Sequence, residues 1–178
     1  MRNKILWITR TGVLTALLIL LQAFTKPAGQ LVTGSCVNAV LAVAVLFAGL
    51  GSGLTVALIS PIFAFWLGIA PQILTVPVIM GGNAIFVALL HFLYGQQLWQ
   101  KLLAWLAASA CKFCVLFLLV RYVICGILAD GLLAQGLLKT PMLTALPATF
   151  GATQLVTALI GGGIAMLILP VLRKALRR

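Results

Sequence analysis

The sequence predicts an all-α polytopic membrane protein, a single transmembrane domain over residues 1–178 with six transmembrane helices and both termini in the cytoplasm. Hydrophobic residues make up 63% of the chain and charged residues only 7%, whereas roughly a quarter of the residues in a soluble domain are charged. A soluble core of this size could not bury so much apolar surface. Six spans of about 20 residues need about 120 positions, and the apolar stretches supply them.

The predicted spans are apolar stretches bounded by basic, polar or glycine-rich residues, and they cover approximately residues 6–24, 36–50, 54–68, 74–93, 101–125 and 148–172. Arg10 interrupts the first stretch, and residues 23–28 form a poor cleavage site, so a membrane helix is predicted there rather than a secretion signal. A polar connector from Thr25 to Ser35 follows. We expect this connector to be a loop that orders over a bound ligand.

Glycine and proline define the next elements. The run Gly49–Gly53 is so short that it can only join the second and third spans as an antiparallel hairpin. Pro61 should kink the third span. Glycines interrupt the fourth span at 81–82 and the sixth at 161–163.

Residues 126–147 resist assignment to a span. They carry Asp130 and Lys139 and are too interrupted to cross a membrane. They form either an interfacial helix or lid on the outer surface, or a mobile loop.

The basic residues predict the orientation. On a six-span topology eight cations share one side, against Lys26 and Lys139 on the other. Because basic loops face the cytoplasm, that side is the inside, and five or seven spans would put one basic terminus outside. The eight cations are Arg2, Lys4, Arg10, Lys101, Arg173, Lys174, Arg177 and Arg178.

The charge balance excludes several functions. The net charge is +11, and Asp130 is the only acidic residue. Carriers that use carboxylate relays, membrane aspartyl proteases and metal-dependent phosphotransferases all need more acidic groups. No phosphate-binding loop of the ATPase type occurs, and the cations lie at span ends, as orientation signals rather than a nucleic-acid surface. We therefore expect no enzyme activity, no nucleic-acid partner, no cofactor and no energy source within the chain.

Two basic residues fall inside the fifth predicted span. Lys112 lies roughly 19 Å from the outer end of that helix, too deep to reach water easily, so it should face a cavity or a partner. It could bind an anionic ligand, donate as an uncharged amine to a backbone carbonyl, or face a partner subunit. Arg121 is nearer the surface and can extend outward, although it stays a candidate substrate contact. The two lie about 180° apart around the helix.

Three amides in other spans complete the candidate site. Asn38, Asn83 and Gln154 lie in the outer halves of the second, fourth and sixth predicted spans, where they can bind a polar ligand or join helices. Cys111 and Cys114 have metal-ligand spacing, but the chain has no second pair, so buried free cysteines are predicted and no metal site.

Several of these features resemble the substrate-binding S component of an energy-coupling factor (ECF) transporter. The resemblance covers nearly the whole chain. Its motifs are the six spans in about 180 residues, the basic termini, Gly12-x-x-x-Ala16, Thr33-Gly34-Ser35-Cys36-Val37-Asn38, the glycines at 49–53, and Gly82-Asn83. Gly12 departs from the alanine-rich pattern usual on the first helix of that family.

This resemblance implies a function and a set of partners. An S component in a bacterial or archaeal plasma membrane captures a vitamin or related micronutrient from outside. It delivers the compound through a transmembrane T component, which two ABC ATPases drive with ATP. Gly12 and Ala16 would then dock the T component, and Asn38, Asn83 and Gln154 would contact the ligand.

Two other classes of membrane protein are alternatives. A six-span scaffold of the rod-shape determining type has a similar outline and transports nothing. A small channel would need repeated rings of polar residues in its pore, and the sequence has no such repetition.

Overall fold

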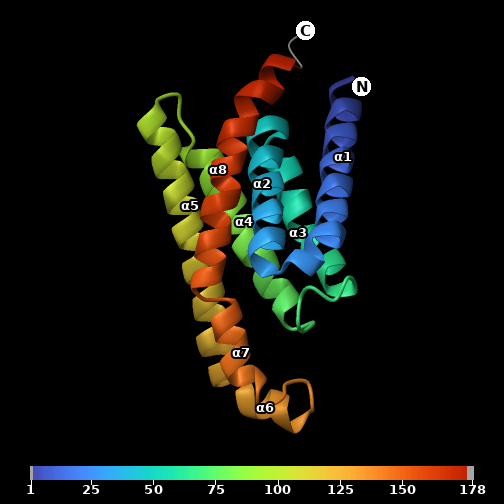
Figure 1. The fold of residues 1–178 in the computed structure, drawn as a ribbon, viewed down its shortest axis with the longest axis vertical. Helices are drawn as coiled ribbons and strands as arrows, with labels where there is room; N and C mark the ends of the chain where they lie inside the picture. Colours follow the sequence, from blue (N-terminus) through green and yellow to red (C-terminus); the bar gives the residue numbers. More distant parts are fainter. Residues whose placement is uncertain (1, 176–178) are drawn as a thin grey trace.

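A computed structural model describes the backbone of residues 2–175 and the side chains of residues 4–175. This part of the chain is helical throughout, apart from short connections (Figure 1). The elements in chain order are α1 Arg2–Thr25, the 3-10 turn η1 Lys26–Ala28, α2 Gln30–Ala48, α3 Leu50–Trp66, α4 Thr75–Leu93, α5 Leu98–Leu118, the π-helical η2 Leu119–Ile127, α6 Ala129–Ala134, α7 Met142–Thr149 and α8 Ala152–Ala175.

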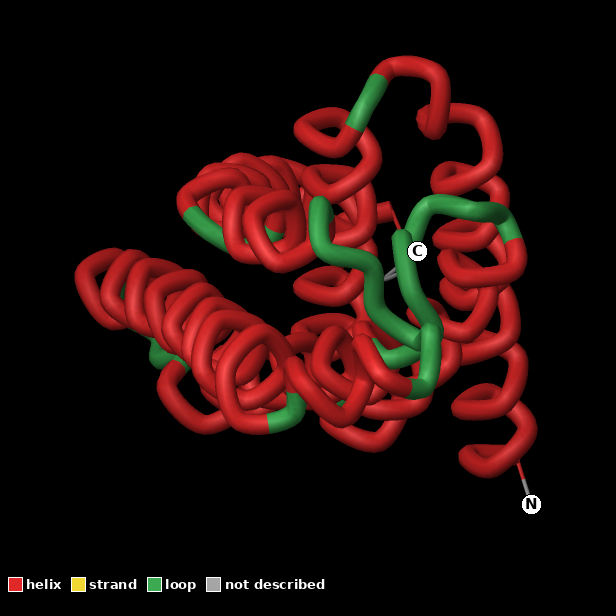
Figure 2. The backbone as a smooth tube through the Cα atoms, turned by 90° about the horizontal axis from the view of Figure 1, so that it is seen from below, coloured by secondary structure: helices red, strands yellow, loops and turns green. Residues whose placement is uncertain are grey.

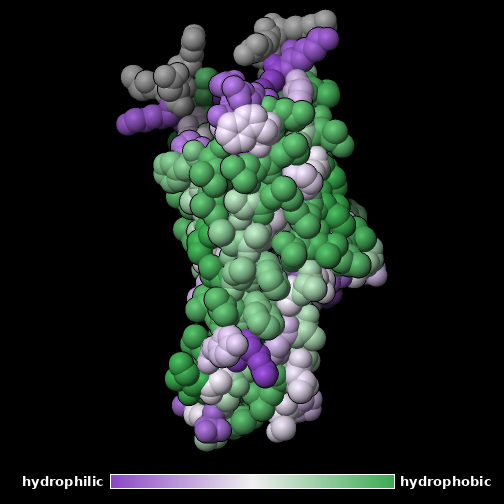
Figure 3. Space-filling model, turned by 90° about the vertical axis from the view of Figure 1, so that its left-hand side faces the viewer, coloured by the Kyte–Doolittle hydropathy of each residue, from purple (hydrophilic) through white to green (hydrophobic). Residues whose placement is uncertain are grey.

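Most of these helices suit a membrane. Five helical stretches of the described chain are long and apolar enough to cross one, namely Lys4–Ala28, Gln30–Ala48, Thr75–Leu93, Leu98–Ile127 and Met142–Ala175. The predicted span missing from this set is the third, which corresponds to α3, an apolar helix of 17 residues. It is somewhat shorter than the 20 or so that a straight crossing needs. Figure 3 shows an apolar surface over most of one side. The fold is therefore compatible with a multi-pass membrane protein.

The helices form one bundle around α2. Residues 38–45 of α2 are all buried, and α2 packs against α1, α3, α4 and α8. The start of α1 and the end of α8 lie at one end of this bundle, which we call the termini end (Figure 1). At the opposite end, η2 and α7 run side by side beyond the ends of α1 to α4, with α6 at the tip. Figure 2 looks along the bundle from that tip and shows connecting loops crossing this end.

The segment from Thr25 to Ser35 differs from its prediction. The prediction of a loop is wrong for most of this segment, because residues 26–28 form η1 and α2 begins at Gln30. Thr33 and Ser35 are buried, and the Ser35 hydroxyl donates to the carbonyl of Leu31 at 2.6 Å. These residues are polar because they face the bundle interior, and a helix already occupies the position of the expected mobile lid.

Two other connections are also more ordered than predicted. The hairpin between α2 and α3 turns at Gly49 alone, with φ of 93°. Gly53 instead lies within α3, where a Cβ would come within 2.8 Å of Val45 Cβ. Residues 126–147 form α6, α7 and the end of η2, and they contribute Leu138 and Leu146 to a small apolar core with Val120, Ile124 and Phe150. The segment is therefore a folded helical tip and not a loop.

Closely packed glycines set the distance between the helices. α8 crosses α2 at Gly161, where a Cβ would lie 2.6 Å from Asn38 Cβ and 2.7 Å from the backbone nitrogen of Ala39. Gly163, half a turn further on, has space, because a Cβ there would meet Trp105 at an ordinary 3.5 Å. Glycine at 161 therefore allows the approach that brings α8 against Asn38.

We predict that Gly161→Ala lowers the free energy of unfolding by about 1–3 kcal/mol, because overpacking forces α2 and α8 apart. Gly163→Ala is the matched control and should be neutral or slightly stabilising, since alanine favours helix. Thermal unfolding of both purified variants in detergent measures the difference. Equal losses in the two variants would contradict the packing argument.

Candidate functional site

Lys112 is held in the interior of the bundle by two asparagines from neighbouring helices. Its side chain on α5 is 2% exposed. The ammonium donates hydrogen bonds to Asn38 Oδ1 on α2 at 2.5 Å and to Asn83 Oδ1 on α4 at 2.7 Å, and it lies 5.5 Å from the centre of the Phe86 ring. The lysine thus uses side-chain amide oxygens as acceptors instead of a backbone carbonyl.

Local packing explains why these three side chains meet. A Cβ on Gly82 would come within 2.7 Å of Leu116 Cγ, so the glycine lets α4 and α5 approach closely at this level. Asn83 follows Gly82, and Lys112 lies one helical turn before Leu116. The close contact therefore places the amide and the ammonium opposite one another.

The amide nitrogens of the two asparagines are also occupied. Asn38 Nδ2 donates to Thr157 Oγ1 at 3.3 Å, and that hydroxyl donates to the carbonyl of Gln154 at 3.1 Å. Asn83 Nδ2 makes a longer bond of 3.5 Å to the carbonyl of Ala57. These bonds orient both amide oxygens toward Lys112, and five helices, α2, α3, α4, α5 and α8, contribute to the network.

A small cavity, lined by both apolar and polar side chains, adjoins this network. Its volume is about 70 Å³, and a buried water needs about 10–15 Å³, so it can hold several waters or part of a small solute. The polar side chains that line it come from α1, α2, α3, α4, α5 and α8, and they include Gln22, Thr33, Asn38, Ser60, Asn83, Lys112 and Gln154.

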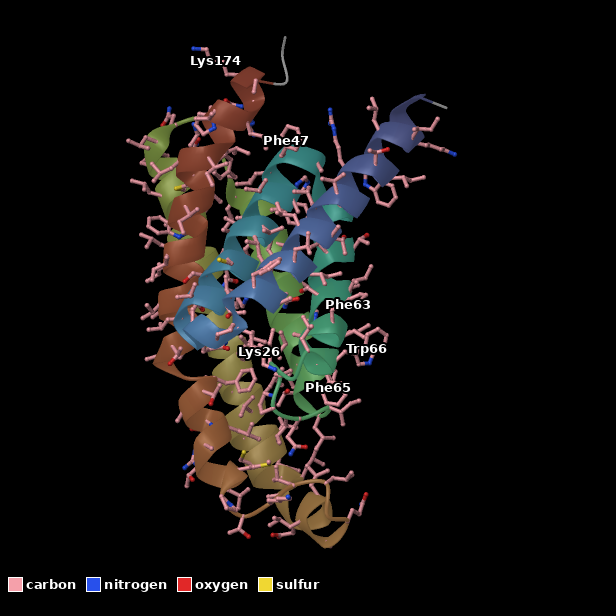
Figure 4. All side chains as sticks on the ribbon, turned by 45° about the vertical axis from the view of Figure 1, so that its right-hand side comes forward. Lys26, Phe47, Phe63, Phe65, Trp66 and Lys174 are labelled. Carbon is pink, nitrogen blue, oxygen red and sulfur yellow. The ribbon has the colours of Figure 1, made fainter. Side chains whose placement is uncertain are left out.

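The turn between α3 and α4 covers the cavity. Ile69, Ala70 and Pro71 of this turn contribute to the lining. Lys26 donates to the carbonyl of Leu67 at 2.6 Å, which ties the start of the turn to η1. Figure 4 shows Lys26 beside the end of α3, where Trp66 projects away from the bundle.

A second contact ties the same turn to the helical tip. Gln72 Nε2 donates to the sulfur of Met142 on α7 at 2.9 Å, and Phe150, between α7 and α8, lines the cavity. The cavity is thus enclosed by segments that meet at the end of the bundle remote from the termini.

Two polar atoms in the cavity lining are available for further hydrogen bonds. Gln22 Oε1 and Ser60 Oγ are buried, and neither has a hydrogen-bond partner among the described residues. Buried polar atoms are nearly always paired, so these atoms are suited to a ligand or to water. Neither residue was predicted from the sequence. A glutamine near the end of an apolar span was the available clue to Gln22, whereas a lone serine such as Ser60 gives none.

The cavity lining contains one basic side chain, Lys112, and no acidic one. Asp130, the only acidic residue of the sequence, is exposed on α6 at the tip. The oxygens around Lys112 are neutral amide oxygens, so its charge is solvated but not balanced. A carboxylate or phosphate entering the cavity would gain a charge-assisted hydrogen bond.

The structure brings together four of the five predicted substrate contacts. Asn38, Asn83, Lys112 and Gln154 line the one cavity. Arg121 is exposed on η2 and is not part of that lining.

The remaining predicted residues lie on outer surfaces. Gly12 and Ala16, the predicted docking residues, are exposed on α1. Cys111 and Cys114 are free, as predicted, but exposed on α5. Their predicted burial is wrong, because this side of α5 faces outward from the bundle.

The chain was compared with protein-family models, curated proteins and solved structures, and none of them matches it. Fold and site define an all-helical protein, compatible with a membrane, with a cavity lined by a buried lysine and several uncharged polar side chains.

We predict that Lys112→Met and Asn83→Leu each lower stability by about 1–3 kcal/mol, because each leaves a buried partner without its hydrogen bond. The double variant should cost less than the sum of the two, since both partners are then removed. Ser109→Ala, close to Lys112 on α5, is the control. Its buried hydroxyl has no partner in the described chain, so its loss should be neutral. If the stability loss of the double variant in thermal unfolding equals the sum of the losses of the two single variants, the network is contradicted.

Proposed function

We propose that this chain is the substrate-binding S component of an ECF-type ABC importer. It captures a vitamin or related micronutrient from outside and passes it to a T component driven by two ATPases. The observation that carries the proposal is Lys112, a buried cation that lines a cavity while the chain's only acid lies elsewhere. The chain itself performs no catalysis and holds no cofactor, and its partners use the ATP.

The proposed topology has six spans in a bacterial or archaeal plasma membrane, with α3 as a short span. Two facts support cytoplasmic termini. The start of α1 and the end of α8 lie at the same end of the bundle. The helix segments at that end also carry Lys4, Arg10, Lys101 and Arg173, as the positive-inside rule requires. Of the other four predicted cytoplasmic cations, Lys174 is in the last turn of α8. Arg177, Arg178 and the side chain of Arg2 lie outside the described residues.

This topology directs the cavity toward the exterior. The cavity lies near the end remote from the termini, under the turn between α3 and α4. A solute would therefore reach Lys112 from outside, and release to the inside would require the bundle to rearrange against another subunit.

The proposed docking face lies on α1. Gly12 and Ala16 are exposed and lie one turn apart, and a Cβ added at Gly12 would meet nothing within 4 Å. Small residues at this spacing let another helix approach closely in a membrane. Exposed Val13 and Leu17 flank them and add apolar contact.

Ala16→Leu should abolish uptake while leaving folding and ligand binding intact, because a large side chain blocks close helix approach. The assay is whole-cell uptake of the transported compound. Ala110→Leu, at an exposed position on α5, is the matched control and should transport normally. Normal uptake by Ala16→Leu would remove the docking role.

Ligand binding tests the cavity. We expect water-soluble vitamins and related metabolites that carry a carboxylate or phosphate to raise the melting temperature of the purified protein, and their neutral amides or esters to do so less. Lys112→Met should weaken binding of the best anionic compound about tenfold or more, because a charge-assisted hydrogen bond contributes about 1.5–3 kcal/mol.

Lys139→Met is the control, since Lys139 is exposed beyond the cavity, and it should bind as the wild type does. Unchanged affinity in Lys112→Met would remove Lys112 from the substrate site. Failure of every compound to stabilise the protein would favour the non-transporting scaffold.

A further inference from the structure

A second recess lies at the termini end of the bundle, remote from the Lys112 cavity. Its volume is about 340 Å³. The ends of α2, α4 and α8, the start of α5 and the turn after α4 form its walls. The side chains that carry its chemistry are His91, Tyr94, Gln96, Lys101 and Arg173.

Cations gather around this recess. Arg173 donates to the carbonyl of Leu46 at 2.9 Å, which fixes the guanidinium beside the recess and leaves further N–H donors free to bind. Lys101 is half-buried, and its ammonium lies 5.9 Å from the centre of the Tyr94 ring. Arg10 of α1 lies over the ring of Phe47, another lining residue, at 5.0 Å.

Tyr94 adds a neutral hydrogen-bond donor. Burial raises the pKa of Tyr94 above its ordinary value, and this effect exceeds the opposing effect of Arg173. The phenol is therefore protonated at neutral pH. The chain's only carboxylate side chain, Asp130, belongs to α6 at the opposite end of the molecule, so no acidic side chain neutralises these cations.

The surroundings of the recess are apolar. Phe92, Leu98 and Trp99 are 73%, 72% and 59% exposed, and they flank His91, Tyr94 and Lys101 in sequence. Tryptophan is enriched where a membrane meets water. Figure 4 shows Phe47 and Lys174 at this end of the molecule, and Figure 3 shows hydrophilic side chains above an apolar surface. The recess thus lies where lipid headgroups would meet the protein.

We propose that this recess binds the phosphate of an anionic phospholipid. Guanidinium, ammonium and phenol groups match the phosphate oxygens, and basic pockets between membrane helices on the cytoplasmic side bind anionic headgroups. Phe92, Leu98 and Trp99 would contact the acyl chains. An acidic segment of a partner protein would satisfy the cations but leave these apolar side chains without a role. The site is independent of the Lys112 cavity and of transport.

The test uses the full-length protein in neutral detergent, with native mass spectrometry to count bound lipids. Phosphatidylglycerol should bind at one tight site, and zwitterionic phosphatidylcholine should bind at least about tenfold more weakly. The double variant Lys101→Gln, Arg173→Gln should lose about 25-fold in affinity, since each cation contributes about a fivefold factor. Lys174→Gln removes a neighbouring cation that does not line the recess and should bind normally.

Three results would overturn the proposal. An equal loss in Lys174→Gln would mean diffuse attraction by the basic surface. Inorganic phosphate that displaces the lipid at similar concentration would assign the recess to free phosphate compounds, and hexaglutamate that does so would assign it to an acidic protein segment. If the loss of the Arg173–Leu46 hydrogen bond prevents folding, Lys101→Gln alone carries the test, with an expected loss of about fivefold.

Discussion

Burying the Lys112 ammonium removes it from water, and the positions of α2, α4 and α5 allow two asparagine oxygens to replace part of that hydration. A charged group in this position is costly unless it is hydrogen-bonded. The close helix contacts at Gly82 and Gly161 keep the two asparagines within reach. Helix packing and the chemistry of the cavity therefore depend on the same few contacts, and changing either disturbs the other.

A chain with a single acidic residue has few ways to balance its cations internally. In the two recesses described above, this composition leaves basic side chains without an acidic partner. One encloses Lys112 inside the bundle, and the other gathers Lys101 and Arg173 beside the membrane surface. In each recess, the protein supplies uncharged hydrogen-bond acceptors, and an anionic ligand or lipid would balance the positive charge. The buried recess suits a solute that must later leave, whereas the surface recess suits a component of the membrane itself.

The sequence predicted the all-helical class and the meeting of Lys112 with Asn38, Asn83 and Gln154, because polar residues in apolar helices must face one another. The prediction failed where a polar residue could belong either to a loop or to the interior of the bundle. Thr33 and Ser35 resembled a loop, although they are polar because they face the interior of the bundle. Cavity groups such as Ser60 depend on helix rotation, which periodicity does not determine in helices that are apolar on all sides. The six-span count also stays a prediction, since α3 is short.

The central claim is that the Lys112 cavity holds an anionic micronutrient. The most direct measurement is mass spectrometry of the small molecules released on denaturing the protein after purification from cells grown in rich medium, for wild type and Lys112→Met in parallel. The account predicts one compound with a carboxylate or phosphate, close to equimolar with wild-type protein and strongly depleted from Lys112→Met. A neutral or cationic compound, or an anionic one retained equally by Lys112→Met, would contradict it.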